Sequence, residues 1–194
     1  MVKNIFPDSK VQKTLYHYTV RENVEKILKY GFKLASELTA DKYYTNRFDG
    51  VYFTNSDKSY WGDDLEQIAV KVNIQNPLDI SDFPLDEEKF NPVQRLLAEK
   101  IGRILQVAED NHDKIMKGRY SAVIMAKEAT KAFQAAGYDG LIFLGPAGHI
   151  EHVVFDPKQV HIIGTNVERF NVAKNQLEQK MIVAETLNHK LMDK

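Results

Sequence analysis

The sequence lacks cysteine altogether over its 194 residues. This absence excludes disulfide bonds and zinc sites built on thiolate ligands. Long apolar runs are missing as well, since no stretch approaches the ~20 apolar residues that span a bilayer and the first residues lack the apolar core of a signal peptide. We therefore expect a cytoplasmic protein with no membrane partner.

Neither sign of charge predominates, because 26 lysines and arginines face 27 aspartates and glutamates. A chain with this balance has no overall attraction to nucleic acid or to an anionic lipid surface. Basic residues do gather between positions 114 and 131, where they form either a local patch or an ordinary solvated surface. The sequence also lacks the phosphate-binding loop, Gly-x-Gly-x-x-Gly, His-Glu-x-x-His and nucleophile-elbow patterns, so it carries no sign of those chemistries.

Apolar residues at strand and helix spacing divide the chain into short elements, and their 43% share is sufficient for one globular core. Strands are expected at residues 12–19, 67–75, 141–144 and from about 151, and helices at 22–30, 93–108 and 126–136. A loop is expected at 76–84. This mixture is typical of an α+β domain built on antiparallel sheets. The domain should occupy residues 1–165, followed by a C-terminal helical tail at 166–194 that packs on it or contacts a partner.

Three short segments place a polar side chain within an apolar strand pattern. They are residues 15–19 (LYHYT) with His17, residues 50–54 (GVYFT) with Tyr52, and residues 151–160 (EHVVFDPKQV), which begin with Glu151. In their order and spacing they resemble the His-Tyr-Glu signature of the diphtheria-toxin and poly(ADP-ribose) polymerase branch of the ADP-ribosyltransferases. The stretch 56–60 (SDKSY) is similar to the short helix that carries a serine and a second tyrosine in that family.

The resemblance implies an ADP-ribosyltransferase-like fold of the α+β class, in which antiparallel sheets form an NAD cleft with flanking helices. NAD would be the co-substrate, with no metal. Glu151, His17 and Tyr52 would be the catalytic residues. The NAD-binding residues would be His17, Tyr18, Thr19, Tyr52, Ser59 and Tyr60.

Within this set, His17 and Thr19 would lie against ribose hydroxyls. Ser59, together with the main chain of Tyr18, would hold the carboxamide. The rings of Tyr52 and Tyr60 would enclose the nicotinamide, because an aromatic face attracts a flat cationic ring.

A glutamate suits the chemistry that this assignment requires. As the N-glycosidic bond of NAD breaks, the ribose becomes oxocarbenium-like, as sugars do in glycoside hydrolysis. A carboxylate that bonds the ribose 2′-hydroxyl and faces the developing cation stabilises mainly the transition state. Glu151 is the candidate for this role, and the alternative is an edge-strand glutamate that points to solvent. Tyr52 is alternatively a core aromatic, and His17 a structural hydrogen-bonding residue.

Two positions depart from the family pattern. Tyr18 stands where members commonly carry glycine, and His149 stands where the arginine-modifying branch carries Glu or Gln. The second departure argues against arginine as the acceptor. His149 should share a strand face with Glu151, where it either orients or deprotonates a nucleophile or is a bystander. His149 and His152 do not form a metal pair, because strand residues three apart face opposite sides.

We expect a mono-ADP-ribosyltransferase that transfers ADP-ribose from NAD to a macromolecular acceptor, either protein or nucleic acid. Small members of this class often act as toxins in bacterial or phage conflict, so the resemblance also implies a neutralising protein partner. Two alternatives stay open. In an NAD glycohydrolase water would replace the acceptor, and a catalytically silent binding module would use the C-terminal helix as its contact surface.

Overall fold

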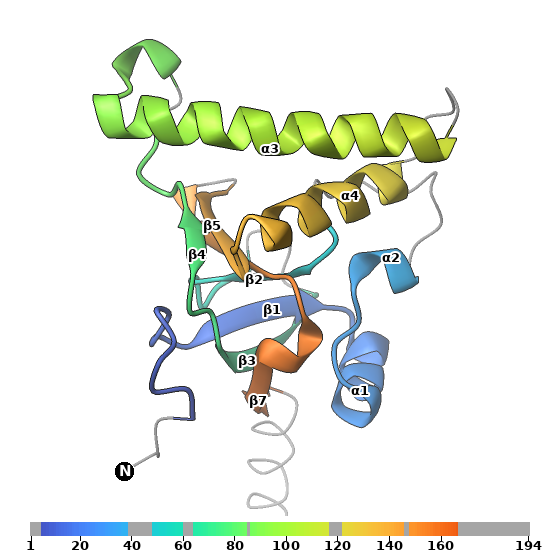
Figure 1. Cartoon of the computed structure of the whole chain (residues 1–194). Helices are drawn as coiled ribbons and strands as arrows, with labels where there is room; N and C mark the ends of the chain where they lie inside the picture. Colours follow the sequence, from blue (N-terminus) through green and yellow to red (C-terminus); the bar gives the residue numbers. More distant parts are fainter. Residues whose placement is uncertain are drawn as a thin grey trace, which may run out of the picture.

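Short strands and helices alternate along residues 5–38, 48–59, 64–84, 86–116, 122–145 and 148–166, the part of the chain that the structure, a computed structural model, describes. The strands are β1 (Leu15–Thr19), β2 (Val51–Thr54), β3 (Glu66–Val72), β4 (Pro77–Asp79), β5 (Gly140–Leu144), β6 (Ile150–Val154) and β7 (Val160–Thr165). The helices are α1 (Arg21–Tyr30), α2 (Ala35–Leu38), α3 (Pro92–Met116) and α4 (Ala122–Ala135). The α+β class is confirmed (Figure 1). The expected tail, apart from Asn166, lies outside the described residues.

The strands form one mixed sheet in the order β4-β5-β6-β2-β1-β3-β7. All neighbouring pairs are antiparallel except β4 and β5, which run parallel. A parallel pair needs a crossover connection, and α3 and α4 supply it between these two strands. The expectation of antiparallel sheets therefore fails at this edge. The expected loop at 76–84 is also wrong in part, because Pro77 opens β4 at the first position of an edge strand, where proline is tolerated.

Strands β1 and β2 share only a short pairing in the middle of the sheet, where the register joins Tyr16 to Thr54. By contrast, β1 pairs with β3 from Leu15 to Thr19, and β2 pairs with β6 along its whole length. Residues 17–19 of β1 and 51–53 of β2 therefore diverge, and we term this region the seam. It divides the sheet into the groups β1-β3-β7 and β2-β6-β5-β4.

The two faces of the sheet bury different apolar clusters. The central cluster includes Leu15, Phe53, Ile68, Val70, Ile142 and Val154, and Val24 of α1 packs into it. The helix-side cluster includes Leu78, Leu141, Val153 and Phe155, together with Phe133 of α4 and Leu97, Ile101 and Ile104 of α3. Figure 1 shows α3 and α4 lying together over this second face. Each face of the middle strands is therefore closed by its own set of side chains.

The long helix predicted from the apolar spacing is confirmed, but the first apolar residues of that spacing do not lie on its buried face. In α3 the side chains that pack on the sheet start at Leu97 and continue at helical spacing. Val93 and Leu96 stay 74% and 66% exposed. A period of 3.6 residues predicts a helix, whereas the position of β4 and β5 decides which side of it is buried.

Gly140→Ala should destabilise the fold, because a Cβ there would lie 2.8 Å from the Val153 carbonyl oxygen and 3.1 Å from two side-chain atoms of Ile74. Overpacking of this kind costs about 1–3 kcal/mol. The control is Gly102→Ala in α3, where a Cβ meets nothing within 4 Å. A helical alanine is more stable than glycine by about 0.5–1 kcal/mol. Urea unfolding measures both, and equal stabilities of the two variants would contradict the close packing of β5 on β6.

Candidate functional site

The structure brings the three sequence segments onto neighbouring strands. His17 lies on β1, Tyr52 on β2 and Glu151 on β6, and these strands are consecutive in the sheet. The register pairs Thr54 with Glu151 and Tyr52 with Val153. Segments far apart in the sequence therefore meet beside the seam.

Tyr52 and Glu151 face the same side of the sheet. Side chains alternate along a strand, so Tyr52 and Thr54 of β2 and their β6 neighbours Glu151 and Val153 all point toward the helices. The half-buried ring of Tyr52 packs against the helix-side cluster, and its hydroxyl donates to the Phe48 carbonyl oxygen at 3.2 Å. The ring of Tyr52 is thus part of the core on which this side of the site rests.

Glu151 is a buried residue, with only 7% of its surface exposed. It lies opposite Thr54 of β2 and Phe143 of β5, inside the sheet, so the alternative of an edge-strand glutamate in solvent is wrong. Its side chain passes over Gly145, where a Cβ would overlap the Glu151 Cγ and lie 3.2 Å from Oε1. The Gly145 N–H donates to the His149 carbonyl oxygen at 2.8 Å and closes the turn before β6. Gly145 thus leaves the space that the Glu151 side chain occupies.

His17 lies at the seam with its ring among aromatic side chains. It meets Phe32 and Phe53 edge-on at centroid distances of 5.2 and 5.9 Å, on the face opposite the Tyr52 ring. Its Nδ1 lies 2.9 Å from the Tyr52 carbonyl oxygen. A carbonyl only accepts, so Nδ1 carries the hydrogen and Nε2 of the neutral ring is an acceptor. Burial lowers the pKa of His17 despite the bond to Tyr52, which keeps the ring neutral near pH 7.

Tyr18 and Thr19 make side-chain hydrogen bonds beside the seam. The Tyr18 hydroxyl donates to the Ser56 carbonyl oxygen at 3.1 Å and accepts from Gln67 Nε2 at 2.8 Å. Burial is the largest cause of a raised pKa for Tyr18. Asn23 Nδ2 donates to Thr19 Oγ1 at 3.1 Å. The Tyr18 side chain therefore fixes the turn that follows β2.

The remaining candidates lie around this turn or outside the described residues. Ser59 is half-buried and follows the turn that Tyr18 fixes. Tyr60 is outside the described residues, so its place beside the nicotinamide stays a prediction. His149 precedes β6 and belongs to the turn closed by Gly145, so the expected strand face shared with Glu151 does not apply to it.

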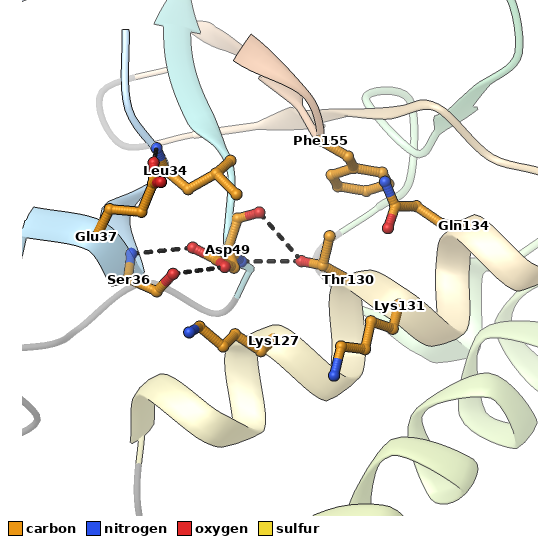
Figure 2. A pocket seen from close by; sticks show the side chains of 9 residues that line it. All are labelled: Leu34, Ser36, Glu37, Asp49, Lys127, Thr130, Lys131, Gln134 and Phe155. Carbon is orange, nitrogen blue, oxygen red and sulfur yellow. Dashed lines mark hydrogen bonds between the residues drawn. The ribbon is translucent and has the colours of Figure 1, made fainter.

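Sequence reasoning missed a cavity of about 390 Å³ between α2, α4 and the turn before β2. Figure 2 shows Asp49 between Ser36 of α2 and Thr130 of α4. Ser36 donates to both Asp49 carboxylate oxygens, from its N–H at 2.9 Å and from its hydroxyl at 2.7 Å. The Asp49 N–H in turn donates to Thr130 Oγ1 at 2.9 Å. Asp49 reads in the sequence only as a turn residue, yet these bonds hold the start of β2 against α4.

His152 follows Glu151 on β6 but faces the central cluster. It is 1% exposed, and its Nδ1 has no hydrogen-bond partner among the described residues. Burial, together with the nearby positive charge of Lys13, lowers the pKa of His152 to about 4. Two adjacent residues of one strand thus place a carboxyl group and a neutral imidazole on opposite faces of the sheet.

Comparison of the chain with protein-family models, with curated proteins and with solved structures finds no match. Across the described ranges, no helix combines the length and apolar character needed to cross a bilayer. Within the same residues, no group of three His, Asp or Glu side chains is placed to hold a metal ion.

Protonation of His152 should couple folding to pH. Its folded-state pKa of about 4 lies below the ordinary 6.5, so the unfolded chain binds the proton more tightly. The resulting stability is complete above about pH 6.5, and about 3 kcal/mol is lost as the pH falls to about 4. His17, whose pKa is also lowered, acts in the same direction. Urea unfolding across this range should show a shallower decline for His152→Phe than for wild type, and parallel curves would contradict the lowered pKa.

Proposed function

We propose that this chain is an NAD-dependent mono-ADP-ribosyltransferase that transfers ADP-ribose to a macromolecular acceptor, protein or nucleic acid. One observation carries the proposal. The strands that bear His17, Tyr52 and Glu151 are consecutive, and β1 and β2 diverge at His17 and Tyr52, next to the Thr54 that lies opposite Glu151. A sheet that only buried a core would gain from continuous pairing there, because each unpaired main-chain group needs another partner. The divergence therefore favours a ligand site at the seam.

NAD would pass through the seam between the two faces of the sheet, because His17 faces the central cluster whereas Tyr52 and Glu151 face the helices. Its N-glycosidic bond would lie beside Glu151. The neutral His17 ring would offer the acceptor Nε2 to a ribose hydroxyl, since Nδ1 already donates to the Tyr52 carbonyl oxygen. Glu151 would accept a hydrogen bond from the 2′-hydroxyl and stabilise the cation that develops on the ribose. Burial of Glu151 strengthens this attraction, because charges interact more strongly where water is excluded. Tyr52 would contribute only the face of its ring, because its hydroxyl is bonded to Phe48.

The tyrosine at position 18 is compatible with this arrangement. Only its main chain would contact the carboxamide, while its side chain holds the Ser56 carbonyl oxygen and Gln67. The turn fixed in this way leads directly to Ser59 and Tyr60, the two residues expected at the nicotinamide end. The Tyr18 side chain would thus position the segment that leads to Ser59 and Tyr60. A glycine at position 18 has no side chain to do so.

Glu151→Gln tests the proposal. The variant keeps the shape of the side chain but loses its charge, so transfer should fall about 10²–10³-fold while NAD affinity stays within a few-fold. Each protein is incubated with cell lysate and NAD labelled in the adenylate phosphate, and the product is divided between protease and nuclease treatment. Glu99→Gln, which changes an exposed glutamate of α3, is the matched control and should behave as wild type.

Each outcome of this assay identifies a function. Label that reaches a polymer only when Glu151 is intact would establish a transferase, and the treatment that removes the label would identify the acceptor. Release of nicotinamide with free ADP-ribose would instead indicate an NAD glycohydrolase. Full activity in Glu151→Gln, or no turnover of NAD by wild type, would contradict the proposal and favour a binding module.

Gly145→Ala should slow the reaction through the position of the carboxylate. The added methyl group would displace the Glu151 side chain, whose Cγ and Oε1 lie against that site. Misplacement of a reacting group by about 1 Å costs on the order of 10²-fold in rate. In the double variant with Glu151→Gln, the second change should add little, since both act through one carboxylate. Fully multiplicative losses would show that Gly145 acts elsewhere.

A further inference from the structure

A second cavity, of about 330 Å³, lies on the face of β6 opposite Glu151. The register places Asp79 of β4, Ile142 of β5 and His152 of β6 in one row across three neighbouring strands. Ile150 stands two residues before His152 and so shares its face. Residues 10–13 of the N-terminal segment complete the lining. The cavity therefore lies behind the candidate catalytic strand, away from the seam.

The N-terminal part of the lining is held by several hydrogen bonds to β3 and the residues after it. Lys10 N–H donates to the Ile74 carbonyl oxygen at 2.7 Å, and Ile74 N–H donates to Ser9 Oγ at 3.1 Å. Lys71 Nζ donates to the Gln12 carbonyl oxygen at 2.6 Å. These hydrogen bonds fix the main chain of residues 10–13 against the sheet, so the position of the cavity wall is determined by the fold.

Polar groups of four residues around the cavity lack partners among the described residues. The ammonium groups of Lys10 and Lys13 make no hydrogen bond or ion pair there. Asp79 accepts from the Ser81 N–H at 3.0 Å and hydroxyl at 2.7 Å, both at Oδ1, and no donor from the described part of the chain reaches Oδ2. His152 Nδ1 is the deepest of these groups and is unpartnered in a side chain that is 1% exposed. This nitrogen is closed off from solvent, so the groups open to a ligand are those of Lys10, Lys13 and Asp79.

We propose that this cavity binds a small phosphorylated sugar or polyol. Two lysine ammonium groups suit a phosphate dianion, and the free oxygen of Asp79 suits hydroxyl donors. The His152 side chain lines the same cavity, so its ring reports on whether the cavity is occupied. Val11, Ile142 and Ile150 offer apolar surface to the C–H groups of the ligand. The volume lies at the lower end of the range of about 300–1,000 Å³ that small-molecule sites occupy.

Simpler ligands fit this set of groups less well. Inorganic phosphate would pair with the lysines but leave Asp79 unused. A neutral sugar would use Asp79 but leave both ammonium groups without a counter-charge. An apolar ligand would leave all three of these polar groups unsatisfied, which opposes binding. The combination of phosphate and hydroxyl groups in one small molecule uses all three residues.

Isothermal titration calorimetry of the full chain with ribose 5-phosphate tests the proposal. Saturable binding is expected, and ribose or inorganic phosphate alone should bind about tenfold more weakly or less. The Lys10→Gln, Lys13→Gln double variant should weaken binding about tenfold or more, because charge-assisted contacts to phosphate are lost at exposed positions. Lys33→Gln removes an equally exposed lysine outside the cavity and should bind as wild type does.

The ring-nitrogen NMR signals of the histidines provide a second readout that locates the ligand. Those of His152 should shift in step with saturation, whereas those of His17 should not, which separates this cavity from the seam. No saturable binding at millimolar ribose 5-phosphate, unchanged binding in the double lysine variant, or an unmoved His152 signal would each overturn the proposal. If inorganic phosphate bound as tightly as ribose 5-phosphate, the proposal that the ligand contains a sugar or polyol would be overturned.

Discussion

Strand β6 has a neighbouring strand on each side and an apolar cluster on each face, so the two-residue period of a strand decides what each face holds. Glu151 and Val153 face the helices, whereas His152 and Val154 face the central cluster. A slip of one residue would exchange these sets and turn the carboxylate into the central cluster. Pairing with β5 along the whole of β6, and with β2 from Glu151 to Val154, opposes that slip. Which side chains each face presents thus depends on one register.

The divergence of β1 and β2 removes main-chain pairing, and side chains supply part of the replacement. Beyond the pair at Tyr16, His17 Nδ1 donates to the Tyr52 carbonyl oxygen and the Tyr18 hydroxyl donates to the Ser56 carbonyl oxygen. Main-chain carbonyl groups in a folded interior require a donor, and a side-chain donor can hold two strands at a spacing that a ladder cannot. The side-chain hydrogen bonds therefore hold β1 and β2 at a defined separation at the seam, which a frayed strand end would lack.

Local patterns in the sequence predicted most of the elements but not how they meet. The alternation of Ile68, Val70 and Val72 marked β3, and all three are fully buried. The helical period of α3 left its buried side undetermined, and Val93, with which the apolar spacing begins, is exposed. Three residues were too few to reveal β4, whose pairing exists only because α3 and α4 return the chain beside it. The adjacency of the three motifs and the hydrogen bonds of Asp49 involve residues that are distant in sequence. The burial of His152 Nδ1 likewise depends on neighbouring strands. No local sequence pattern predicts any of these features.

Strands β3 and β6 form a contrast within one sheet, since both are interior strands. Where β3 buries four apolar residues from Ile68 to Val72, β6 buries Glu151 and His152 beside two valines. Stability does not require buried polar residues in β6, because apolar residues of similar volume often replace buried polar ones at no cost. Polar residues in an otherwise apolar interior strand are expected where a protein functions. Glu151 and His152 point to opposite faces, so a single site on either face would account for only one of them, which is why a site is proposed on each face.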